Sequence, residues 1–138
     1  MKRFLPALCA LGLCATAVAQ PATTPLDGTW RGTSDGGSCN APLDFVLSID
    51  YGVVDGSAFD TTARGPVPNL KHAPPPAPTP GLWQVYGVAK GDSFPLTAYA
   101  SVQGAARRST KLAVVAQGNT LTVTESGGCG RTARLSRG

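Results

Sequence analysis

The most reactive side chains of this chain belong to four cysteines, and their spacing divides them into two pairs. Cys9 and Cys14 lie in an apolar run near the start, whereas Cys39 and Cys129 lie in the remainder. No Cys-x-x-Cys redox motif is present, and the single histidine, His72, leaves too few partners for a metal site built on two cysteines. In an oxidising compartment, Cys39 and Cys129 are expected to form one disulfide, which would stabilise the fold by roughly 4 to 5 kcal/mol at most.

Acid–base or nucleophilic catalysis would need residues that this sequence does not bring together. His72 follows Lys71 in a proline-rich segment, and no serine or carboxylate is placed to complete a triad with it. Asp44 and Asp50 alternate with apolar residues, as acids on the solvent side of a strand do, and Asp55 is expected in a turn. We therefore predict no catalytic residue, no cofactor and no metal site, and Lys71 and His72 become candidate contacts for a partner protein.

The first residues have the pattern of a secretory signal peptide. Lys2 and Arg3 form a positive head, residues 4–18 are apolar, and Ala17 and Ala19 are the small residues of a cleavage site. The apolar run is shorter than the ~20 residues that a bilayer-spanning helix needs. We expect cleavage after Ala19, no transmembrane span in the mature chain, and a periplasmic or extracellular location. An uncleaved membrane anchor is the alternative.

The composition is that of one small folded domain. The chain has 138 residues, of which 42% are hydrophobic, and its 17 glycines and 12 prolines are too few to indicate disorder. Its net charge of +4 falls further when the two cations of the signal peptide leave, so nucleic acid is not an expected partner. We predict a signal peptide at 1–19, a flexible leader at 20–25 and one domain at 26–138. Sparse lysine and abundant alanine suggest a bacterial source.

Short apolar runs typical of β-strands alternate with turn signals along the rest of the chain. No longer stretch has apolar positions at helical spacing, so an all-β fold is predicted. The eight expected strands cover residues 28–34, 43–51, 53–62, 82–90, 94–102, 110–117, 120–126 and 130–136. Turns are expected at Asp55-Gly56, Gly91-Asp92, Gly118-Asn119 and Gly127-Gly128.

Residues 43–51 form the clearest of these strands because apolar residues occupy every second position. The buried face is expected to carry Leu43, Phe45, Leu47, Ile49 and Tyr51. Eight short antiparallel strands with tight turns favour a small closed up-and-down β-barrel, and a sandwich of seven or eight strands is the alternative. The expected disulfide favours the barrel, because its cysteines follow the first strand and precede the last.

A proline-rich segment interrupts the pattern of short turns. Residues 64–81 contain seven prolines, so they cannot form a helix or a central strand and are expected to be a long loop. Such a loop is either functional, as a lid or a partner-binding arm that carries Lys71 and His72, or a solvated spacer. The sequence leaves both alternatives open.

The start and the end of the predicted barrel resemble those of the calycin group, which includes lipocalins, fatty-acid-binding proteins and avidins. Gly28-x-Trp30 matches the Gly-x-Trp that opens the first strand in that group, and the last strand is expected to carry Arg131, Arg134 and Arg137. The resemblance implies a barrel closed at its base, where Arg134 or Arg137 packs over Trp30 through a cation-π contact. It assigns Trp30 a structural role.

Two non-catalytic functions fit this architecture. The calycin resemblance implies a carrier of a small apolar ligand, with a cavity lined by Phe45, Leu47, Ile49, Val114 and Val123. The general plan is also similar to that of small secreted bacterial inhibitors of proteases or lysozymes, which act on a protein partner through their loops. An open interior would favour the carrier, and an interior filled by side chains would favour the inhibitor or adaptor.

Overall fold

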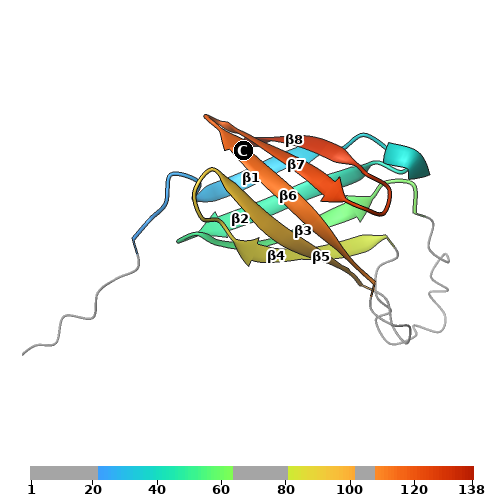
Figure 1. Cartoon of the computed structure of the whole chain (residues 1–138), viewed down its shortest axis with the longest axis horizontal. Helices are drawn as coiled ribbons and strands as arrows, with labels where there is room; N and C mark the ends of the chain where they lie inside the picture. Colours follow the sequence, from blue (N-terminus) through green and yellow to red (C-terminus); the bar gives the residue numbers. More distant parts are fainter. Residues whose placement is uncertain (1–21, 64–80, 102–107) are drawn as a thin grey trace, which may run out of the picture.

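A computed structural model describes residues 22–63, 81–101 and 108–138, and this part of the chain is all-β, as predicted (Figure 1). It contains eight strands and one turn of 3-10 helix. The bounds are β1 Gly28–Thr33, η1 Gly37–Cys39, β2 Leu43–Asp50, β3 Val53–Asp60, β4 Leu82–Val88, β5 Ser93–Ala100, β6 Ser109–Gln117, β7 Thr120–Ser126 and β8 Thr132–Arg137. Within these ranges no helix is long and apolar enough to cross a membrane.

The eight strands form a closed antiparallel barrel in which each strand pairs with the next and β8 pairs with β1 (Figure 1). The predicted up-and-down barrel is therefore confirmed over the sandwich. The seam between β1 and β8 is short, since only Trp30 with Arg137 and Arg31 with Ser136 form ladder pairs. An isolated bridge between Ser34 and Ala133 continues it in the same register.

Gly32 allows the two seam strands to approach one another. A Cβ atom at this position would lie 2.3 Å from the carbonyl oxygen of Arg134 and 2.9 Å from the side chain of Leu135. Backbone atoms cannot move aside as a flexible side chain can, so any other residue would force β1 away from β8. The glycine is therefore a requirement of barrel closure.

The predicted alternation of buried and exposed residues is present on the strands. Along β2, the side chains of Leu43, Phe45, Leu47 and Ile49 point into the barrel and are at most 5% exposed. The inward side chains of the other strands join them in one hydrophobic core. The interior thus holds the apolar half of each strand, and the outer wall holds the polar half.

Two predicted details of the β2–β3 hairpin are wrong. Tyr51 leaves the buried face, because it follows the end of β2 with a φ of 48° and is 49% exposed. Tyr51 and Gly52 form the turn, and positive φ at both residues is what a two-residue hairpin of type I′ requires. The expected turn at Asp55-Gly56 lies inside β3, where these residues pair with Ser48 and Leu47.

The two ends of the barrel differ in the length of their connections (Figure 1). At the turn end, short turns join β2 to β3, β4 to β5 and β6 to β7. At the loop end, the connections are residues 34–42, 61–81, 101–108 and 127–131. Most of the predicted proline-rich loop, with Lys71 and His72, lies outside the described residues, but Ala63 and Gly81, which flank it, belong to the loop end.

The predicted disulfide between Cys39 and Cys129 is confirmed and lies at the loop end. Cys39 ends η1 and Cys129 lies in the β7–β8 turn, 90 positions further along the chain. The backbone N–H of Ser38 donates to the carbonyl oxygen of Cys129 at 2.8 Å beside the covalent bond. The connection after the first strand is therefore held to the connection before the last.

Replacement of Gly32 by alanine tests the close approach at the seam. We expect Gly32→Ala to lower the free energy of unfolding by roughly 1 to 3 kcal/mol, because the new Cβ atom collides with the β8 backbone. The measurement is urea denaturation followed by tryptophan fluorescence. Thr33→Ala, on the exposed side of the same strand, is the control, and an equal effect of the two substitutions would contradict the steric requirement.

Candidate functional site

Trp30 closes the turn end of the barrel. Its side chain is fully buried, and its indole Nε1 donates a hydrogen bond of 2.8 Å to the carbonyl oxygen of Leu26. The guanidinium of Arg137 lies 4.6 Å from the ring centroid and donates to the carbonyl oxygen of Pro25 at 2.7 Å. The predicted cation-π contact is thus present with Arg137, whereas Arg134 is exposed on the outer side of β8.

The carboxylate of Asp27 holds the segment before β1 against the β2–β3 turn. It accepts hydrogen bonds from the backbone N–H groups of Tyr51 at 3.1 Å and Gly52 at 3.0 Å, and from the Thr24 hydroxyl at 2.6 Å. The bond from the Thr24 hydroxyl is the main reason that the pKa of Asp27 lies below its ordinary value of 3.8. Thr24, which the sequence assigns to the leader, is therefore tied to the barrel.

The residues predicted to line a ligand cavity all lie inside the barrel, where they pack against one another. The exposed fraction is at most 4% for Phe45, Leu47, Ile49, Val114 and Val123. Phe45 and Val123 reach a pocket at the loop end, whereas the other three belong to the packed core. The pocket has a volume of about 10 Å³, which is the room that about one water molecule needs.

This pocket has an apolar floor and a charged margin. Trp83 of β4 is half-buried and packs against the core at the same place. The full lining is Leu43, Phe45, Ala58, Trp83, Ala98, Thr110, Leu112, Val123, Glu125 and Arg131. The loop end therefore presents an aromatic ring and an ion pair within one small depression.

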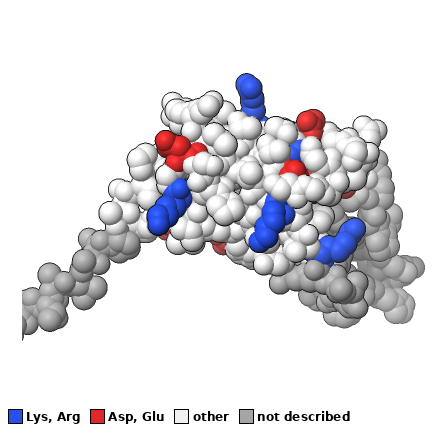
Figure 2. Space-filling model, in the orientation of Figure 1, with Lys and Arg blue, Asp and Glu red and all other residues white. Residues whose placement is uncertain are grey.

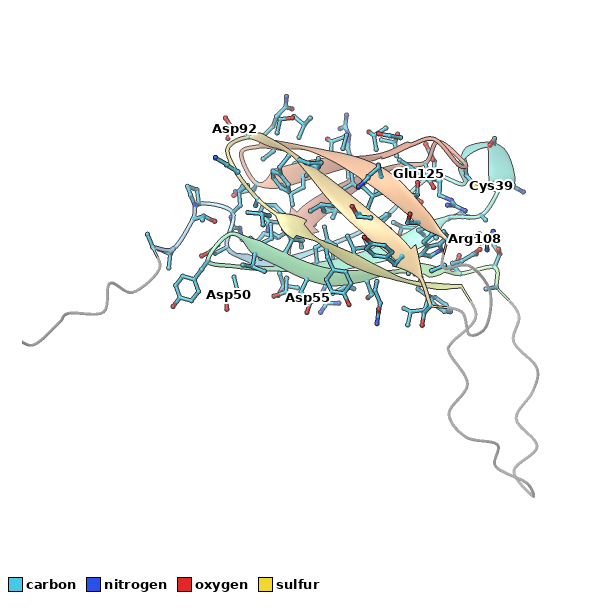
Figure 3. All side chains as sticks on the ribbon, turned by 60° about the horizontal axis from the view of Figure 1, so that its bottom comes forward. Cys39, Asp50, Asp55, Asp92, Arg108 and Glu125 are labelled. Carbon is cyan, nitrogen blue, oxygen red and sulfur yellow. A yellow bond between two sulfur atoms is a disulfide. The ribbon has the colours of Figure 1, made fainter. Side chains whose placement is uncertain are left out.

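Glu125 and Arg131 form a buried ion pair on the margin of the pocket. Arg131 Nη1 lies 3.3 Å from Glu125 Oε2, and the side chains are 8% and 5% exposed, respectively. Arg131 Nε also donates to the carbonyl oxygen of Ala41 at 2.7 Å, so the pair ties the β7–β8 turn to the start of β2. In Figure 3, Glu125 lies at the same end of the barrel as Cys39.

The positive charge of Arg131 also acts on a second carboxylate at the loop end. The pKa of Asp60, at the end of β3, is lowered mainly by the hydrogen bond from the Thr62 hydroxyl at 2.7 Å, and the positive charge of Arg131 adds to the effect. Both groups stabilise the charged form of Asp60. One buried cation thus acts on acids from two strands, Asp60 of β3 and Glu125 of β7.

The role of Arg131 differs from the prediction, which placed it on the last strand with Arg134 and Arg137. It precedes β8 and is 7% exposed, because its charge is matched by Glu125 inside the barrel mouth. The sequence does hold a signal for the pair, since Glu125 follows Val123 at an inward position of β7. On the face drawn in Figure 2, the Lys and Arg side chains stand apart from one another, and Asp and Glu side chains lie among them.

Glu125 and the two cysteines, which belong to the described part of the loop end, each have a partner. The Glu125 carboxylate is engaged by Arg131, and Cys39 and Cys129 are bonded to each other. In the described ranges, no three His, Cys, Asp or Glu side chains come together as a metal site would need. Comparisons of the chain with protein-family models, curated proteins and solved structures find no match.

The buried ion pair is tested by removing one of its charges. Glu125→Gln is expected to lower the free energy of unfolding by roughly 3 to 5 kcal/mol, because it leaves the Arg131 guanidinium buried without a counter-charge. The double substitution Glu125→Leu with Arg131→Met is expected to recover most of this loss. Urea denaturation measures both, and Asp92→Asn, at an exposed acid, should stay within about 0.5 kcal/mol of the parent. Equal losses of unfolding free energy in the single and double variants would show that the unpaired buried charge is not the cause.

The lowered pKa of Asp27 predicts a pH dependence of stability. The hydrogen bonds of this carboxylate contribute above the ordinary pKa of 3.8 and are lost as the pH falls through the lower pKa of the folded protein. The parent protein is therefore expected to lose more thermal stability than Asp27→Asn between about pH 4 and about pH 2. Circular dichroism gives the melting temperatures, with Asp50→Asn as the control. Parallel pH profiles for the parent and Asp27→Asn would refute this role.

Proposed function

We propose that this protein is an exported, non-catalytic binding protein that recognises a partner protein through the loop end of its barrel, as an inhibitor or adaptor does. The signal-peptide pattern of residues 1–19 and the disulfide support a periplasmic or extracellular location in a bacterium. The Gly28-x-Trp30 sequence at the start of β1 and the packing of Arg137 over the Trp30 ring support a calycin-like barrel as the scaffold.

The observation that carries this proposal is the filled interior. Pockets for small organic ligands usually measure about 300 to 1,000 Å³, whereas the pocket at the loop end measures about 10 Å³. Leu47, Val114 and Val123 are at most 1% exposed, so an apolar ligand would have to displace packed side chains. Recognition at the surface needs no such rearrangement.

The loop end is suited to recognition because its frame is rigid. The disulfide joins the β1–β2 connection to the β7–β8 turn, and the hydrogen bond from Arg131 to Ala41 joins the same two segments again. A surface that is ordered before binding loses less conformational entropy when a partner docks. Trp83 supplies the half-buried aromatic side chain around which protein interfaces often concentrate their binding energy.

Enzyme inhibition and ligand uptake together test the proposal. The disulfide-bonded protein is mixed with a c-type lysozyme, a serine protease and a secreted metalloprotease, and is titrated separately with palmitate. We expect inhibition of one of these enzymes at an equimolar amount and no saturable uptake of palmitate. Trp83→Ser should abolish the inhibition, and Val115→Ser, on the outer wall of β6, should leave it unchanged.

The carrier alternative has its own diagnostic variant. Phe45→Trp fills the pocket, so it is expected to cost roughly 1 to 3 kcal/mol of stability and to leave recognition at the surface intact. Binding of one palmitate per barrel that Phe45→Trp removes would replace the proposal with the carrier function. If the protein inhibits none of the three enzymes, a role as inhibitor of these enzyme classes is excluded and the adaptor role remains.

A further inference from the structure

The exposed large hydrophobic side chains of the described residues gather on one part of the outer wall. Six such side chains are more than a third exposed, and five of them come from β3, β4 and the β2–β3 turn. Four of these, Tyr51, Val53, Tyr86 and Val88, form what we call the β3–β4 patch, with exposed fractions of 49%, 58%, 41% and 60%. Elsewhere on the wall, β7 and β8 present mainly Thr, Ser and Arg to solvent.

The strand register places the members of the patch side by side. Val53 of β3 pairs directly with Val88 of β4, and Tyr86 lies two residues before Val88 on the same side of the strand. The Tyr86 ring lies 6.5 Å from that of Tyr99 on β5, at an angle of 46°. The patch is therefore a continuous apolar surface on paired strands, which cannot move apart without breaking the barrel.

Tyr51 is held at the edge of this patch at a conformational cost. A bulky side chain at a φ of 48° is rare, and such a conformation persists only where neighbouring contacts determine it. Here the Asp27 carboxylate binds the backbone N–H groups of both turn residues, Tyr51 and Gly52. Asparagine or glycine would form the same turn without strain. The stability of the turn therefore does not explain why an exposed aromatic side chain occupies this position.

Two carboxylates border the patch without a partner. Asp50 pairs with Val53 across β2 and β3, and Asp55 pairs with Tyr86 across β3 and β4. Neither carboxylate forms a hydrogen bond or an ion pair with any described residue, and both are exposed. Figure 3 shows Asp50 and Asp55 pointing away from the barrel on the same side. The β2 and β3 side of the apolar surface thus carries a negative rim, whereas on the β5 side Lys111 Nζ donates to the hydroxyl of Thr97, the cross-strand partner of Tyr86, at 3.0 Å.

We propose that the β3–β4 patch is a docking surface for a segment of a partner protein that presents apolar side chains together with lysine or arginine. An apolar centre with exposed tyrosines and a charged rim is the composition of protein interfaces, and the rim selects a partner of opposite charge. The surface lies on the wall towards the turn end, away from Trp83 and the pocket, so it stands whether or not the loop end binds a protein.

Two other occupants fit the patch less well. A second copy of this chain would present the same four apolar side chains and the same two carboxylates, so its β3–β4 patch would bring no cation to match Asp50 and Asp55. A glycan would stack on tyrosine rings but would gain little from Val53 and Val88, which are the most exposed members of the patch and offer no hydrogen bond. The observations therefore favour a basic, apolar segment of a protein.

The test uses two synthetic peptides that differ only in charge. Both alternate leucine and valine with charged residues, which are lysine and arginine in one peptide and glutamate in the other. Each is titrated into the isotopically labelled, disulfide-bonded protein, and amide shifts are followed by NMR. We expect saturable binding of the basic peptide alone, with shifts confined to Tyr51, Val53, Asp55, Tyr86, Val88 and their neighbours. The affinity should fall with added salt.

Surface variants separate the patch from the rest of the molecule. Tyr86→Ser is expected to weaken the basic peptide about tenfold, and Asp55→Asn to weaken it about threefold at low salt and to remove most of the salt dependence. Val115→Ser, at an exposed valine on β6, and Trp83→Ser, at the loop end, should change the affinity less than twofold. A cooperative thermal transition above the temperature of the titration will show that each variant is folded, and Trp83→Ser is expected to melt at a lower temperature because it removes a ring that packs against the core.

Several outcomes would overturn the proposal. These are the absence of saturable binding by the basic peptide, equal binding of the acidic peptide, and shifts centred on the loop end. Concentration-dependent dimerisation that Tyr86→Ser abolishes would assign the patch to a second copy of the chain. Shifts at the patch with an N-acetylglucosamine oligomer, but not with the basic peptide, would assign it to a glycan. None of these results bears on inhibition through Trp83, so the two proposals fail independently.

Discussion

Pairing of the first strand with the last is the constraint on which the rest of this structure depends. Without it, the sheet would present two unpaired edges, and open edges invite pairing with other chains. The seam has only two ladder pairs and one further bridge, so contacts at both ends of the barrel support it. Arg137 packs over Trp30 at the turn end, and the bond between Cys39 and Cys129 joins neighbouring connections at the loop end.

Closure also determines what the inside of the barrel can do. An eight-stranded barrel encloses about as much room as side chains can fill. Here the large Phe45 pairs with the small Ala58 and Leu47 pairs with Gly56, so that the inward side chains pack into a core. The interior stabilises the protein, and in our proposals recognition takes place at one end and on the outer wall. Both candidate surfaces therefore rest on backbone that the core and the closed sheet keep in place.

Much of this fold follows from local sequence pattern. The alternation of Leu43, Phe45, Leu47 and Ile49 with polar residues sets the buried face of β2. Dipeptides that contain glycine mark several of the turns. If the predicted signal peptide is removed, only Cys39 and Cys129 remain, and two cysteines allow one pairing. These features depend on a residue and its near neighbours, which is why strand positions, barrel and disulfide could all be predicted.

The functional details that were missed depend on contacts between distant parts of the chain. Gly52 marks the break between two strands, but no neighbouring residue indicates that Tyr51 itself joins the turn, because the group that holds it there is Asp27, 24 positions earlier. The sequence around Arg131 does not distinguish it from a surface cation. The only local signal for its burial is that its partner, Glu125, falls at an inward position of β7. The packed interior, on which our proposal of recognition at the surface rests, depends on how side chains from all the strands meet.

The large sequence separation between the residues that meet at the seam also determines the order of the folding steps. Arg137 and Pro25, which meet at the turn end, are 112 positions apart, whereas the β2–β3 and β6–β7 hairpins close over two-residue turns. Ordering a long loop costs more entropy than ordering a short one, so the hairpins form early and the ring of strands closes last. A chain synthesised from its N-terminus therefore leaves one edge of β1 unpaired until β8, the last strand, is available to pair with it.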